Sequence, residues 1–117
     1  MTHFRFDEYL CAVCRRPASG LAVAAKGRRN SPLAWVCDDS ECIQIAKDSF
    51  DMRQTEFSRL DEKAAIMGGD SAGQYLDSIG KTDLAKLDEK EWQTFCRTLV
   101  GAYRESLKTT LKDEAPF

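Results

Sequence analysis

Apolar residues in the second half of the chain recur every three or four positions, which is the spacing of amphipathic helices. Thr55 can cap the first of these segments, and Gly68 and Gly69 are predicted to end it in the left-handed conformation. A second, short helix is expected over residues 70–79, with Gly80 as its terminator. The pattern therefore predicts a series of helices joined by glycine stops.

The longest and most regular apolar stripe lies near the C-terminus, after a brief turn expected over residues 84–87. Asp88 and Glu91 have the spacing of a reciprocal N-terminal cap, which predicts a helix start. We expect Trp92 to be buried, whereas the last two members of the stripe should be exposed and available for dimerisation or a partner. The stripe comprises Trp92, Phe95, Cys96, Leu99, Val100, Tyr103, Leu107 and Leu111.

The first half of the chain has a different pattern, with short apolar runs separated by turn residues. The runs at 21–25 and 33–36 flank the link KGRRNSP, which predicts a β-hairpin with a basic tip. The second strand leads into Cys37, and the acidic residues after it favour a helix N-terminus. Cys42 is expected in the first turn of that helix, which should reach about Phe50.

Length and composition limit the architecture that these elements can build. The 117 residues, 43% hydrophobic and 31% charged, fit one globular unit. No apolar run approaches the roughly 18 residues of a membrane span, and the N-terminus lacks the pattern of a signal peptide. We expect a cytoplasmic α+β protein, mostly α, with a finger over residues 1–50 and three or four helices over residues 51–117 packed on it as one compact unit.

Four of the five cysteines have the spacing of a metal site. Cys11, Cys14, Cys37 and Cys42 form the pattern C-x2-C-x22-C-x4-C, with one pair on a predicted turn and one at a helix start. Short cysteine pairs of this kind each offer two thiolates to one tetrahedral Zn²⁺. Four protein thiolates leave no coordination position for water or substrate. The pattern therefore predicts one structural zinc ion and no enzymatic activity.

Other interpretations of these cysteines remain open at this point. They include buried free thiols, disulfides, an iron–sulfur cluster, and a thiol oxidoreductase that uses Cys11 and Cys14. Cys96 is predicted to be a small core residue because it lies on the apolar stripe. His3, the only histidine, is a weak candidate for an additional metal ligand.

Two resemblances extend this interpretation. The order of turn, hairpin and W-V-C-x4-C helix start over residues 9–50 resembles treble-clef zinc fingers, although Arg15 and Arg16 stand where glycine is usual. The segments GQYLDSIGKTDLAKL, EW-x2-F and GAY-x3-L, over residues 70–107, resemble small zinc-finger proteins of phages and prophages. The second resemblance implies a phage-encoded protein that inhibits or modulates a bacterial host component in defence, transcription or replication.

The charge distribution bears on the kind of partner. Residues 1–36 carry a formal charge of +4 and residues 37–117 carry −6. An acidic total disfavours nucleic-acid binding by the whole surface, so we expect a protein–protein interaction module. The alternative is a nucleic-acid-binding finger whose basic edge comprises Arg15, Arg16, Lys26, Arg28 and Arg29.

Overall fold

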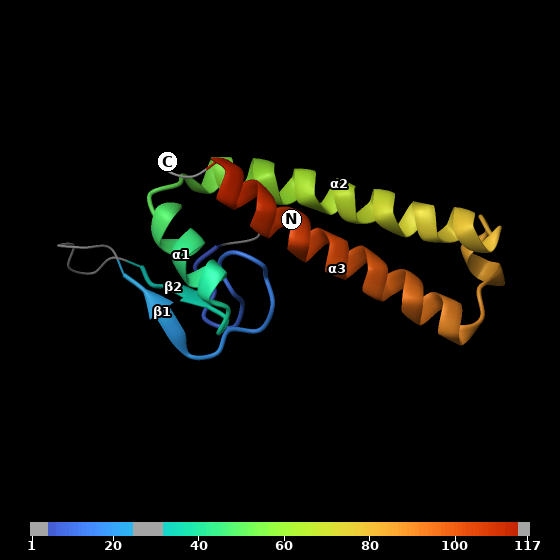
Figure 1. Cartoon of the computed structure of the whole chain (residues 1–117), viewed down its shortest axis with the longest axis horizontal. Helices are drawn as coiled ribbons and strands as arrows, with labels where there is room; N and C mark the ends of the chain where they lie inside the picture. The colour runs from blue at the N-terminus through green and yellow to red at the C-terminus, as the bar shows by residue number, and fades with distance from the viewer. Residues whose placement is uncertain (1–4, 25–31, 115–117) are drawn as a thin grey trace.

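A computed structural model describes residues 5–24 and 32–114 of the protein (Figure 1). The chain is elongated, with extents of 55 × 25 × 25 Å. Residues 5–24 and 32–53 form a small finger, and two long antiparallel helices, α2 (Gln54–Ile79) and α3 (Glu89–Glu114), extend from it. The α+β, mostly α fold class predicted from the sequence is confirmed, with three α-helices and one hairpin in the described residues.

The finger contains the predicted hairpin. Strand β1 (Leu21–Val23) pairs antiparallel with β2 (Ala34–Val36), and Leu21 lies opposite Val36. The loop that precedes β1 is hydrogen-bonded to β2, because the Ala12 amide donates to the carbonyl of Trp35 at 2.7 Å. Most of the basic tip lies outside the described residues.

Helix α1 (Ser40–Asp48) begins directly after β2, as the acidic segment predicted. Asp39 is its N-cap and accepts a hydrogen bond from the Glu41 amide at 2.9 Å. Cys42 therefore lies in the first turn, where the side chain points back toward the N-terminal end of the helix.

The end of α1 is held by Arg5, a contact that sequence analysis did not anticipate. Arg5 is 1% exposed, and its guanidinium donates to the carbonyls of Ser49 at 2.6 Å and Met52 at 2.8 Å. Burial lowers the pKa of Arg5 to about 10, so the side chain remains cationic at neutral pH. A buried cation is tolerated here because carbonyl oxygens of the link between α1 and α2 accept its hydrogen bonds.

Helix α2 is continuous, so the predicted stop at Gly68 and Gly69 is wrong. The reason is tertiary packing: Gly68 is buried at the crossing with α3, where an added Cβ would lie 2.7 Å from the carbonyl oxygen of Leu99. The glycine allows the two backbones to approach closely rather than ending the helix. Gly80, with φ of 67°, ends α2 as expected. The predicted cap is also shifted, because α2 begins at Gln54 with Arg53 in the cap position.

The neighbouring glycines give a matched test of this packing. Gly68→Ala is expected to destabilise the protein by about 1–3 kcal/mol, because backbone atoms of α3 must move away. Gly69→Ala and Gly73→Ala are expected to stabilise it by about 0.5–1 kcal/mol, since an added Cβ at either position meets nothing within 4 Å. Urea denaturation of the three variants measures the difference. Equal effects at the three positions would show that α2 and α3 do not cross at Gly68.

Helix α3 starts as predicted, but the burial of its stripe is the reverse of the prediction. Asp88 and Glu91 form the reciprocal cap at 2.8 and 3.0 Å. Trp92 is 47% exposed, whereas Leu107 and Leu111 are fully buried. The physical reason is that the C-terminal half of α3 lies against both α2 and the finger, while its first half contacts α2 alone (Figure 1).

The buried core lies where the finger meets the first half of α2 and the C-terminal half of α3, a region that we call the base. It is one cluster that combines the four predicted ligand cysteines with Phe57, Leu60 and Ala64 of α2 and with Leu107 and Leu111 of α3. Cys96 is only partly buried, on the half of α3 that lies away from this cluster. We call residues 66–100 the arm. It comprises the C-terminal part of α2, the connection that contains the 3₁₀ turn η1 (Leu84–Lys86), and the N-terminal part of α3.

Candidate metal centre

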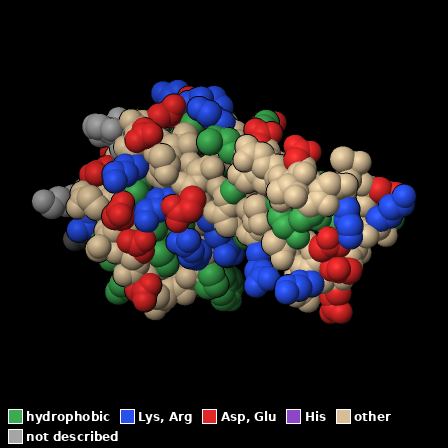
Figure 2. Space-filling view, turned by 45° about the vertical axis from the view of Figure 1, so that its right-hand side comes forward, with side chains coloured by type: hydrophobic (Ala, Val, Ile, Leu, Met, Phe, Trp, Pro, Cys, Tyr) green, Lys and Arg blue, Asp and Glu red, His purple; other side chains and the backbone are tan. Residues whose placement is uncertain are grey.

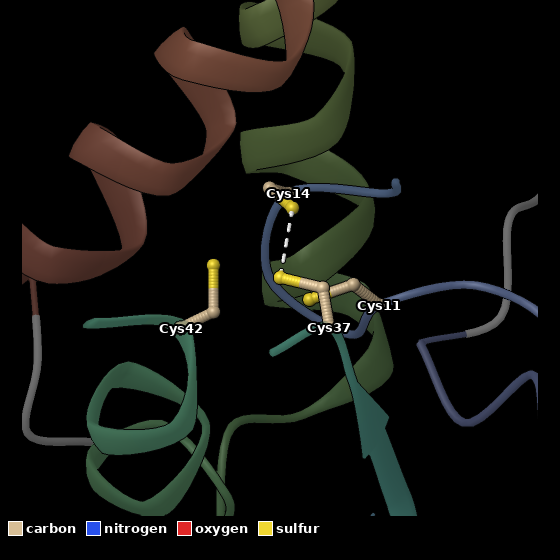
Figure 3. A group of neighbouring side chains, drawn as sticks. All are labelled: Cys11, Cys14, Cys37 and Cys42. Carbon is tan, nitrogen blue, oxygen red and sulfur yellow. Dashed lines mark hydrogen bonds between the residues drawn. The ribbon is translucent and has the colours of Figure 1, made fainter. Parts of the chain in front are cut away.

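Four cysteine side chains converge at one point in the finger (Figure 3). Cys11 and Cys14 come from the N-terminal loop, Cys37 follows β2, and Cys42 comes from the first turn of α1. Their sulfur atoms all lie within 4.8 Å of one another, and no side chain of the four is more than 5% exposed. Residues far apart in the sequence thus form one buried group of soft ligands.

The loop that carries the first pair is a tight turn held by its backbone. The Cys11 amide donates to the Arg16 carbonyl at 2.7 Å, and the Val13 amide lies 3.5 Å from the Cys11 sulfur as a donor. Arg15 has a φ of 61°, the left-handed conformation that glycine adopts most easily. The conformation costs a non-glycine residue about 1–2 kcal/mol. The Arg15 side chain is buried, with its guanidinium 5.6 Å from the ring centre of Phe57, and this contact offsets part of the strain.

The spacing of the sulfurs fits a tetrahedral ion. Two thiolates bound at 2.3 Å to one tetrahedral Zn²⁺ lie about 3.8 Å apart. The Cys14 and Cys37 sulfurs are separated by 3.8 Å, and the remaining pairs need only small movements. All five cysteines are free thiols, so the disulfide interpretation is wrong. The four clustered cysteines can hold a metal ion.

The buried cysteines also shift one another's pKa values. The pKa of Cys11 lies well below its usual range because the Cys14 and Cys42 thiols donate hydrogen bonds to its thiolate. The pKa values of Cys14 and Cys42 are raised, since holding that thiolate requires their protons and burial disfavours further charge. Without a cation, the cluster therefore stabilises one thiolate. Ionisation of Cys14 and Cys42 is disfavoured unless a cation lies between the sulfurs.

Comparison with known proteins gives a match to the two long helices and not to the finger. A family model described as a family of unknown function, DUF6511, matches residues 54–117. The chain belongs to the DUF6511 family. The DUF6511 match begins at the first residue of α2 and contains none of the four clustered cysteines. No curated protein and no solved structure matches the chain.

The DUF6511 helices nevertheless contact the cysteine site through α3, which sequence analysis did not detect. Lys108 pairs with Asp39 at 2.8 Å, and Lys112 pairs with Glu41 at 3.2 Å. Glu105 pairs with Arg16, two residues after Cys14, at 3.3 Å. These residues lie on one side of α3 at positions three, four and seven apart. That spacing was visible in the sequence, but the acidic and basic partners lie about 70 to 90 residues away.

Of the five residues of the predicted basic edge, only Arg15 and Arg16 lie in the part of this DUF6511 protein's finger that the structure describes. Arg15 is 6% exposed and packs on Phe57, so it cannot reach a nucleic acid at the surface. Arg16 is partly exposed and paired with Glu105. Lys26, Arg28, Arg29 and His3 lie outside the described residues. Over the described residues, no helix is sufficiently long and apolar to cross a membrane.

Proposed function

We propose that this protein is a non-catalytic binding protein in which one Zn²⁺ stabilises a treble-clef-like finger and the arm recognises a partner protein. Cys11, Cys14, Cys37 and Cys42 bind the ion. Zinc is the metal that fits best, because four thiolates in a closed tetrahedral arrangement are typical of structural zinc sites. The order of turn, hairpin and helix N-terminus supports the treble-clef assignment.

The buried position of the thiols supports a structural role over a catalytic one. Complete coordination by protein sulfur leaves no position at which a substrate or water could be activated. A thiol oxidoreductase needs an accessible nucleophilic sulfur, and Cys11 and Cys14 are both 0% exposed. Metal binding then serves to hold the finger and the base of the two long helices together.

The observation that carries the binding role is the apolar surface of the arm. Trp92 stacks on Phe95 with ring centres 5.6 Å apart and is still 47% exposed. Beyond Ala72 of α2 and before Leu107 of α3, no residue of these helices is buried. Apolar side chains reach the surface at the extended end of the molecule, bordered by charges of both signs (Figure 2). The exposed large apolar residues of the arm are Ile66, Met67, Leu84, Trp92 and Val100, at 39–62% exposure.

Such a surface is typical of protein recognition. Half-exposed aromatic residues surrounded by polar groups supply most of the binding energy in many protein interfaces. The resemblance of residues 70–107 to phage and prophage proteins directs the search toward a bacterial host protein. No contact in the described residues favours the nucleic-acid alternative, since Arg15 of the predicted basic edge is buried in the core.

Partner capture tests this role. The wild-type protein, immobilised through its C-terminus, is expected to retain a protein from bacterial lysate, and Trp92→Ala should reduce capture at least about tenfold. The matched control is Leu21→Ala, a 50% exposed apolar residue of the finger, which should leave capture unchanged. Capture that survives Trp92→Ala but is lost at high salt or after nuclease treatment would contradict the arm as the binding surface and favour nucleic acid.

A further inference from the structure

The backbone conformation of Arg15 is unusual for its residue type. Arg15 directly follows Cys14, and its amide donates to the Cys11 carbonyl at 3.1 Å, so it closes the turn that carries both cysteines. Its φ of 61° is a value that arginine rarely adopts and glycine adopts readily. A turn that only held a metal would be more stable with glycine at this position. The side chain of Arg15 therefore has a role of its own.

That side chain extends from the finger into the base. Arg15 is 6% exposed, and its guanidinium lies 5.6 Å from the ring centre of Phe57, which is fully buried at the start of α2. One turn further along α2, Asp61 accepts a hydrogen bond from the hydroxyl group of Tyr103 of α3. The side chain of Arg15 thus connects the cysteine turn to α2, next to a contact between the two long helices.

The direction of the Arg15 side chain depends on the shape of the turn. In a free loop a non-glycine residue avoids the left-handed conformation, and a change of φ would turn the side chain in another direction. Zinc bound by Cys11 and Cys14 fixes the turn, because both sulfurs then have to reach the same ion. Bound zinc would therefore hold Arg15 in the conformation that directs its side chain to Phe57.

We propose that Arg15 couples the metal site to the long helices, so that zinc bound in the finger tightens the packing of α2 and α3 in the base. This proposal rests on the zinc site proposed above. The coupling is reciprocal, because the contact with Phe57 stabilises the turn conformation that zinc binding requires. Arg15 is a positioning residue, since it acts on the turn and on α2 without touching the metal.

Two substitutions separate the side chain of Arg15 from its backbone conformation. Arg15→Gly removes the contact with Phe57 but relieves the left-handed strain, so it should bind zinc at least as tightly as the wild type. Arg15→Ala removes the contact and keeps the strain, so it should bind zinc about tenfold more weakly than Arg15→Gly. Competition with a chromophoric chelator measures the zinc affinity of each full-length chain.

Hydrogen exchange with and without zinc measures the coupling itself. In the wild type, zinc should slow exchange over residues 57–64 of α2 more than over residues 92–100 of the arm. In zinc-loaded Arg15→Gly, this additional protection should fall about tenfold, since the contact with Phe57 is lost. Arg16→Ala is the matched control. Its side chain is 40% exposed and paired with Glu105 at the surface, so its loss should leave the protection unchanged.

The outcomes separate this proposal from the zinc assignment. A wild type that binds no zinc would refute both. If the wild type binds zinc but zinc protects residues 57–64 and 92–100 equally, the coupling is overturned and the zinc site stands. The same conclusion follows if Arg15→Gly keeps the full protection, or if Arg16→Ala loses as much of it. Equal zinc affinities of Arg15→Gly and Arg15→Ala would also overturn the coupling.

Discussion

Cys37→Ser is expected to abolish zinc binding and unfold the finger. Structural zinc contributes about 10–16 kcal/mol of apparent binding free energy in finger peptides, which equals or exceeds the whole stability of most small domains. The four sulfurs lie within the core cluster that also contains Leu107 and Leu111, so the loss should spread to the base of α3. Zinc content and far-ultraviolet circular dichroism measure the two effects.

Cys96→Ala is the control for this variant. Cys96 is a free thiol on the half of α3 away from the site, and its removal should leave the zinc content unchanged. Loss of zinc from both variants to the same extent would mean that the ligands have been assigned wrongly.

Leu107→Ala should be far more damaging than Trp92→Ala on the apolar stripe of α3. The side chain is 0% exposed and lies where α3 packs on the finger and α2. Its truncation leaves a cavity and should lower the free energy of unfolding by about 2–5 kcal/mol. Trp92→Ala removes a larger side chain that is half exposed, and should cost only about 1 kcal/mol, chiefly the stacking on Phe95.

The free energy of unfolding from urea titrations distinguishes the two positions. A larger loss at Trp92 than at Leu107 would mean that the arm, and not the base, contains the principal core. The arm would then be unsuited to partner binding.

Local signals predicted local structure well. The hairpin, the helix start at Asp39, the cap formed by Asp88 and Glu91, and the end of α2 at Gly80 are all set by neighbouring residues. The convergence of the four cysteines also followed from short spacings on either side of a hairpin.

The failures involve contacts between distant segments. The sequence pair Gly68 and Gly69 is equally suited to a helix stop and to a close helix crossing, and only the position of α3 decides between them. The regular stripe of α3 showed which face is apolar, but not that only its C-terminal half meets the finger. Arg5 was missed because its carbonyl partners are 44 to 47 residues away.

Metal analysis of the protein, purified without added metal, tests directly whether the four clustered cysteines form a zinc site. We expect one zinc per chain in the wild type and none in Cys37→Ser. A wild-type protein that contains no metal, or that contains iron in place of zinc, would contradict this expectation.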